Sequence, residues 1–159
     1  MSEKHTISCL VENHFGVLAR VSGLISARGF NIDSLTVSTT EDPTISRMTI
    51  VVDADALKLE QVKNQLNRLI DVIEVQELRE GVFIDRELLL ARVNATGAVR
   101  QELERLVAQF GGKFADAADS TVVIEAAGDT KRLDELVERL RPYGITQLVR
   151  TGRVALEKQ

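Results

Sequence analysis

Hydrophobic and polar positions alternate with two different periods in the first thirty residues. Over residues 6–11 the apolar side chains recur at every second position, a pattern that predicts a β-strand with one buried face. From Val17 to Ile25 they recur at helical spacing, and Gly29 follows where helices commonly end. The break Glu12–Gly16 separates the two patterns. This stretch is therefore predicted to be a strand, a sharp loop and a helix.

The rest of the first half completes a unit of six elements. The β-branched segments Ile32–Thr39 and Ser46–Val52 flank the turn residues Glu41–Pro43 and predict a hairpin. A second amphipathic helix opens at Asp53–Asp55, and Val72–Leu78 closes the unit as a strand. The predicted order is βαββαβ.

The second half repeats this order of elements. Its predicted strands and helices are strands at 88–93, 113–117, 121–126 and 145–150, and helices at 99–110 and 133–140. We therefore predict an α+β protein of two tandem ferredoxin-like βαββαβ units, each a four-stranded antiparallel sheet with two helices on one face. The expected domains are 1–78 and 88–159, with 79–87 as the linker.

Such small sheets leave two exposed edges, and natural proteins cover or pair exposed edges. The first half contains unusually apolar candidates for edge strands. We therefore expect a homodimer in which the first sheet continues across a two-fold axis.

The amino-acid composition disfavours several classes of function. The net charge is −4 with no basic run, which disfavours a nucleic-acid partner. Two histidines, one cysteine, one tyrosine and no tryptophan leave too few groups for most catalytic or metal sites, so we expect neither catalytic residues nor a metal site. Cys9 has no disulfide partner and is predicted to lie in the core. No apolar stretch is long enough for a membrane span, and we expect a cytoplasmic protein.

The break between the first strand and helix is the first candidate site. Unsatisfied N–H groups at a helix N-terminus favour an anion such as the carboxylate of an amino acid, and Gly16 would let a ligand approach the backbone. The alternative is that Asn13 caps the helix and Gly16 only eases the turn. A second candidate is Asn31, whose amide could pair with an amine or carboxylate or could simply form the loop before the next strand.

Several blocks of sequence match a family in order and spacing. They are Val11–Arg20, Arg28–Val37, Ser46–Val52 and Asp71–Leu78, with Val82–Leu90 fitting more loosely beyond them. In these blocks the chain resembles the small regulatory subunit of acetolactate synthase (acetohydroxyacid synthase), whose first half is an ACT domain. The resemblance is specific over 6–78 and covers 80–159 in length and pattern.

The resemblance implies a regulatory subunit and not an enzyme by itself. In that family a separate large subunit carries thiamine diphosphate, Mg²⁺ and often FAD, and performs the transferase reaction of branched-chain amino-acid biosynthesis. The small subunit activates it and confers feedback inhibition by a branched-chain amino acid, usually valine. Another hypothesis is a free-standing ACT-type amino-acid sensor that regulates another enzyme or transcription.

Family effectors lie between two ACT domains. Carried over by motif, the effector site takes its residues from the strand-to-helix loop of one chain and the next strand entry of the other: Asn13, Gly16, Val17, Leu18, Asn31 and Ile32. The N–H groups near Gly16 would bind the carboxylate, and the three aliphatic residues would contact the effector's side chain. The pair His14-Phe15 departs from the family, whose loops often carry smaller residues or proline there.

Overall fold

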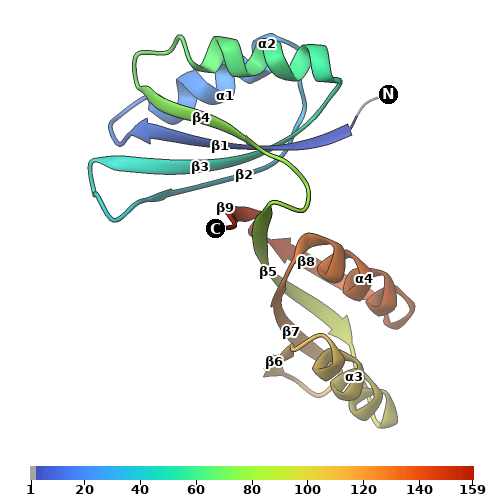
Figure 1. Cartoon of the computed structure of the whole chain (residues 1–159). Helices are drawn as coiled ribbons and strands as arrows, with labels where there is room; N and C mark the ends of the chain where they lie inside the picture. Colours follow the sequence, from blue (N-terminus) through green and yellow to red (C-terminus); the bar gives the residue numbers. More distant parts are fainter. Residues whose placement is uncertain (1–2) are drawn as a thin grey trace. The chain divides into compact units, whose positions relative to one another are not determined.

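The computed structural model describes residues 3–159, which form two compact units. One unit runs up to Ile84 and includes Arg153–Gln159, and the other is Asp85–Gly152. In each unit two helices cover one face of an antiparallel sheet (Figure 1). The predicted α+β class with two ferredoxin-like units is confirmed.

The first unit has all six predicted elements. They are β1 (Glu3–Glu12), α1 (Val17–Ala27), β2 (Ile32–Thr39), β3 (Ile45–Ala54), α2 (Ala56–Leu66) and β4 (Val72–Leu78). The strand order is β2-β3-β1-β4, so β2 and β4 are the edges of this sheet. Every neighbouring pair is antiparallel, as the split βαβ order requires.

The core of the first unit lies between the sheet and its two helices. Ile7, Cys9 and Val11 of β1 are fully buried, as the period of two over residues 6–11 predicted, and Cys9 is 0% exposed. Val21 and Ile25 of α1 belong to the same cluster. Burial raises the pKa of the Cys9 thiol to about 12, because the thiolate would lose its solvation. Cys9 is therefore a core residue, as predicted.

The second face of β1 is also covered. Thr6 and Ser8 are buried, although they point away from the helices. Arg153 Nη1 donates to Thr6 Oγ1 at 2.7 Å, and Arg47 Nη1 donates to Ser8 Oγ at 2.8 Å. The Arg153 guanidinium also lies 5.8 Å from the centroid of the Phe83 ring. The segment that begins at Arg153 thus packs with the first unit.

The second unit repeats the layout. Its elements are β5 (Phe83–Asn94), α3 (Ala98–Gln109), β6 (Lys113–Ala117), β7 (Thr121–Gly128), α4 (Thr130–Leu140), a 3₁₀ turn (Arg141–Tyr143) and β8 (Ile145–Arg150). The strand order is β6-β7-β5-β8. β5 begins within the first unit. A further strand of the first unit, β9 (Val154–Glu157), was not predicted and pairs with β5. The boundary between the two units, between Ile84 and Asp85, falls inside the expected linker 79–87, and residues 153–159 belong to the first unit. None of the helices in residues 3–159 combines the length and apolar character that a membrane span needs.

Candidate functional site

The loop between β1 and α1 turns sharply at Gly16. Gly16 has φ 86°, in the left-handed region, and occupies the N-cap position of α1. A Cβ at Gly16 would meet only Arg20 Nη2, at 3.8 Å, so the backbone conformation and not space favours glycine. No side chain caps the helix. The alternative that Asn13 caps it is wrong.

The first turn of α1 leaves backbone donors unsatisfied. The N–H of Val17 donates to the carbonyl oxygen of His14 at 3.5 Å, and that of Arg20 donates to Gly16 at 3.1 Å. Between them, the N–H groups of Leu18 and Ala19 have no backbone acceptor within residues 3–159. The first turn contains no acidic residue. These N–H groups and the helix dipole together favour an anion.

Asn13 fixes the loop to the turn between β2 and β3. Its backbone N–H donates to the Thr44 carbonyl at 2.7 Å, and its Nδ2 donates to the Pro43 carbonyl at 2.9 Å. With His14 and Ile73 it lines a surface depression of about 380 Å³. Asn13 therefore positions residues 13–18, which we call the 13–18 loop.

On its other side, the loop is held by ion pairs with a buried carboxylate. Asp71, immediately before β4, is 5% exposed. Its Oδ1 lies 2.8 Å from His14 Nε2, and its Oδ2 lies 3.0 Å from Arg20 Nε. Oδ2 is enclosed and receives no well-directed hydrogen bond, so its pairing with Arg20 is mainly Coulombic. The backbone N–H of Glu12 also donates to the Asp71 carbonyl at 2.8 Å. Asp71 thus joins β1, the loop and α1.

Glu12, His14 and Asp71 each offer one atom that could coordinate a metal ion, and these atoms all lie within 4.8 Å of one another. Such spacing would allow these three residues to bind a metal cation. The positive charge of the Arg20 guanidinium, however, already lies beside Asp71. His14 Nε2 also lies 3.1 Å from Glu12 Oε2, so the histidine itself bridges both carboxylates. We interpret the group as an ion-pair network and not as a metal site.

The second part of the predicted site lies at the opposite end of α1. Gly29, with φ 75°, follows the helix, and Asn31 Nδ2 donates to Asp33 Oδ1 at 3.2 Å. Ile32 begins β2 and pairs with Val52. An 11-residue helix is roughly 16 Å long. A single chain therefore does not bring Asn31 and Ile32 to the 13–18 loop.

The two aliphatic residues of the loop differ in orientation. Val17 is 3% exposed and belongs to the core cluster, whereas Leu18 is 46% exposed. The side chain of Val17 therefore packs inward, away from the place where a ligand would lie. Of these two side chains, only Leu18 is presented to a ligand at the helix N-terminus.

Sequence reasoning missed Asp71 and Arg20. No local signal in the sequence indicated a buried Asp71, because the stretch Leu69–Val75 also contains Glu74, which is exposed. Its partner could not be named, because Arg20 lies on a distant part of the sequence. His14 was noted as a departure from the family pattern, and its partners Glu12 and Asp71 were not predicted.

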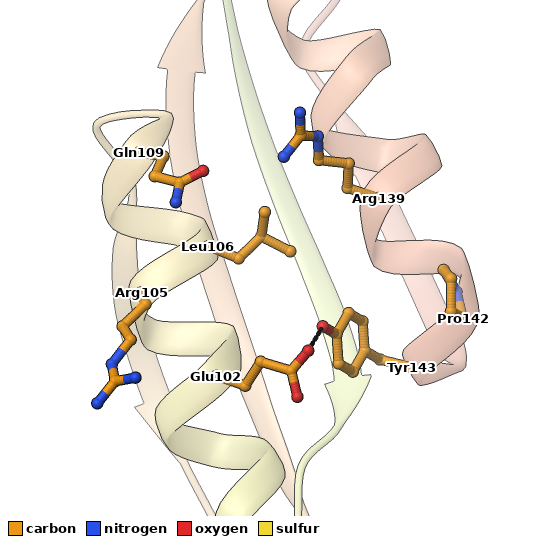
Figure 2. Close-up of a pocket in the computed structure, with 7 residues that line it drawn as sticks. All are labelled: Glu102, Arg105, Leu106, Gln109, Arg139, Pro142 and Tyr143. Carbon is orange, nitrogen blue, oxygen red and sulfur yellow. Dashed lines mark hydrogen bonds between the residues drawn. The ribbon is translucent and has the colours of Figure 1, made fainter.

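A second hollow lies between α3 and α4 of the other unit (Figure 2). Leu106 and Tyr143 face it from the two sides, and Arg139 points into it. The Tyr143 hydroxyl donates to Glu102 Oε1 at 2.5 Å, and this bond raises the pKa of the tyrosine. Arg139 also pairs with Glu135, at 3.1 Å, and we assign this open hollow no ligand.

Two family descriptions match the chain in succession. An AHAS small subunit-like ACT domain matches residues 7–74, and the description "small subunit of acetolactate synthase" matches residues 86–159. The first match contains the 13–18 loop and Asp71. The two matches divide the chain close to the boundary between the units.

Individual relatives cover nearly the whole chain. A probable acetolactate synthase small subunit of Archaeoglobus fulgidus is 48% identical over 153 residues, which is 96% of each chain. The acetolactate synthase isozyme 3 small subunit of Escherichia coli is 40% identical over 98% of this chain and 96% of its own. The crystal structure of a small subunit from Thermotoga maritima has a TM-score of 0.89 at 32% identity, covering 99% of this chain and 98% of that one.

Proposed function

The chain belongs to the acetolactate synthase small-subunit family, and from this premise we propose that it activates a separate catalytic large subunit and makes that subunit sensitive to valine. The observation that carries the effector proposal is the pair of unsatisfied N–H groups, at Leu18 and Ala19, behind the left-handed Gly16. A carboxylate there would receive two hydrogen bonds and the favourable end of the helix dipole.

The rest of the amino acid would be recognised by groups around this position. The exposed Leu18 side chain would contact an aliphatic effector, which favours a branched-chain amino acid over a polar one. Asn13 supports the loop from behind, because both its backbone and its side chain donate to the Pro43–Thr44 turn. Valine is the effector we propose, with leucine and isoleucine as the natural competitors.

The proposed site needs a second copy of the chain. Asn31 and Ile32 lie beyond the far end of α1, so they would complete the site only from a partner ACT domain. β2 is an edge strand of its sheet and could pair with β2 of that partner. We therefore propose a homodimer through the ACT domains with effector sites at its interface.

Regulation then follows from differential binding. An effector that touches two chains stabilises the arrangement of the dimer in which both halves of the site meet. The large subunit would be inhibited when the small-subunit dimer adopts this arrangement. We propose that thiamine diphosphate, Mg²⁺ and FAD belong to the large subunit, since Arg20 and His14 already pair with the carboxylates of the one cluster in residues 3–159 whose spacing could hold a metal ion.

Reconstitution with the large subunit tests the proposal. The purified chain should co-purify with the large subunit, raise acetolactate formation and confer inhibition by valine. Gly16→Asp should abolish the inhibition and keep the activation, because a carboxylate beside the free N–H groups opposes the effector's own. Failure to co-purify or to activate would refute the regulatory role. Retained inhibition in Gly16→Asp would refute the site.

A further inference from the structure

Both ring nitrogens of His14 face oxygen atoms. Nε2 lies 2.8 Å from Asp71 Oδ1 and 3.1 Å from Glu12 Oε2. Nδ1 lies 3.2 Å from the carbonyl oxygen of Phe15. Ionised carboxylates and a carbonyl only accept hydrogen bonds, whereas a neutral imidazole has one N–H. Either neutral tautomer would therefore direct a lone pair at an oxygen, and only the imidazolium satisfies both sides.

Protonation of His14 would affect the structure of the loop, because His14 contacts several parts of the first unit. One side of the ring reaches Asp71, which also holds Arg20 of α1, and the other side reaches the backbone of the loop itself. His14 thereby ties the loop next to Gly16 to the start of β4. We propose that the imidazolium of His14 fastens the 13–18 loop in its binding conformation, so that effector binding weakens as the pH rises and His14 loses its proton. The effector part rests on the proposed function, whereas the fastening of the loop does not.

The charges around the His14 ring also favour effector binding when His14 is protonated. Glu12 of β1 and Asp71 before β4 are negative, Arg20 of α1 is positive, and Thr44 and Ile73 add no charge to the rest of the depression. With His14 protonated the network is neutral, and with His14 neutral it carries a net charge of −1. That negative charge lies beside the position proposed for a carboxylate and would repel it.

The expected titration has a defined sign. The hydrogen bond to the Phe15 carbonyl raises the pKa of His14, and the interactions with Glu12 and Asp71 raise it further. A raised pKa in the folded protein means that the stabilisation is complete below the ordinary value of about 6.5 and is lost as the pH rises through the raised value.

His5 provides a matched control, because it is the only other histidine of the chain. Its Nδ1 lies 3.6 Å from Glu77 Oε1, near the other end of β1. We compare the full chain with His14→Gln, which keeps a donor of similar reach without the charge, and with His5→Gln. NMR titration of the imidazole resonances gives the pKa of His14, and the amide resonances of residues 13–18 report the loop.

The expected result is a His14 pKa above the ordinary value of about 6.5, with loop amides that shift together with the imidazole. The pH-dependent shift of those amides should vanish in His14→Gln and persist in His5→Gln. An ordinary or lowered pKa, or a loop that titrates unchanged in His14→Gln, would overturn the proposal whatever valine does.

Calorimetry with valine then tests the effector part. The dissociation constant should rise about fivefold from about pH 6 to about pH 8 in the full chain and in His5→Gln, and should stay nearly constant in His14→Gln. Valine binding with the same pH dependence in all three proteins would overturn this part. No valine binding at any pH would refute the proposed effector, and the NMR titration would still decide whether His14 fastens the loop.

Discussion

Replacing Gly16 by alanine isolates the backbone conformation on which the proposed site depends. At φ 86° a residue with a Cβ costs about 1–2 kcal/mol relative to glycine. The new Cβ would meet only Arg20 Nη2 at 3.8 Å, an ordinary contact, so no steric term adds to this cost. We therefore expect the first unit to lose about 1–2 kcal/mol of unfolding free energy.

The same helix supplies a control of opposite sign. Gly23 lies inside α1, and a Cβ there would meet no atom within 4 Å. Gly23→Ala should stabilise the unit by about 1 kcal/mol, because alanine is the better helix former. The two variants therefore add the same methyl group to one chain and should differ by about 2–3 kcal/mol.

Urea unfolding followed through amide resonances of β1 measures these changes in the first unit. If Gly16→Ala relieves its strain by moving the loop, the dissociation constant for valine should rise about 5- to 30-fold, which corresponds to the 1–2 kcal/mol of strain. Gly23→Ala should bind valine as the parent chain does. Equal stability of the two variants, or parental valine affinity in a Gly16→Ala chain whose loop amide resonances have moved, would refute the reasoning.

Three other substitutions or reactions test separate parts of the structure. Asp71→Asn should lower the free energy of unfolding in urea by about 1–3 kcal/mol, a range kept low because its partners His14 and Arg20 are half-exposed. An unchanged unfolding midpoint would contradict the role of Asp71 in joining β1, the loop and α1. Cys9 should resist alkylation in native buffer and react on unfolding, because burial raises its pKa to about 12, whereas immediate labelling would contradict the buried core. Gly112→Ala should destabilise the second unit by about 1–3 kcal/mol, because its Cβ would lie 2.8 Å from the Glu125 carbonyl oxygen and from Val107 Cγ1. It should leave valine affinity unchanged, and a loss of affinity would contradict the assignment of the site to the first unit.

The regular elements followed from periodicity because their apolar faces repeat. The period of two in β1 and the helical spacing of Val17, Val21 and Ile25 correspond to residues that the structure buries together. β9 was missed because it has only four residues and its pairing with β5 is not a local property. The role of Arg153 was hidden for the same reason, since its partners Thr6 and Thr36 lie more than a hundred residues away.

The site was predictable in its backbone and less so in its side chains. A strand followed by Gly16 and a helix indicated a sharp loop and free N–H groups at the helix N-terminus, and the structure adds the left-handed conformation of Gly16. Val17 lies in phase with Val21 and Ile25, so its burial in the core followed from the helical spacing. The pairing of His14 with Asp71 depends on how two loops approach each other, which no local pattern contains.

The most direct test of the central claim compares valine with an analogue that lacks the carboxylate. In calorimetry on the full chain, valine should bind, whereas 2-methylpropylamine, which keeps the amine and the branched side chain, should release no heat of binding. This result is expected because the N–H groups at Leu18 and Ala19 would bind the carboxylate, which the amine lacks. Equal binding of the two ligands would contradict the account.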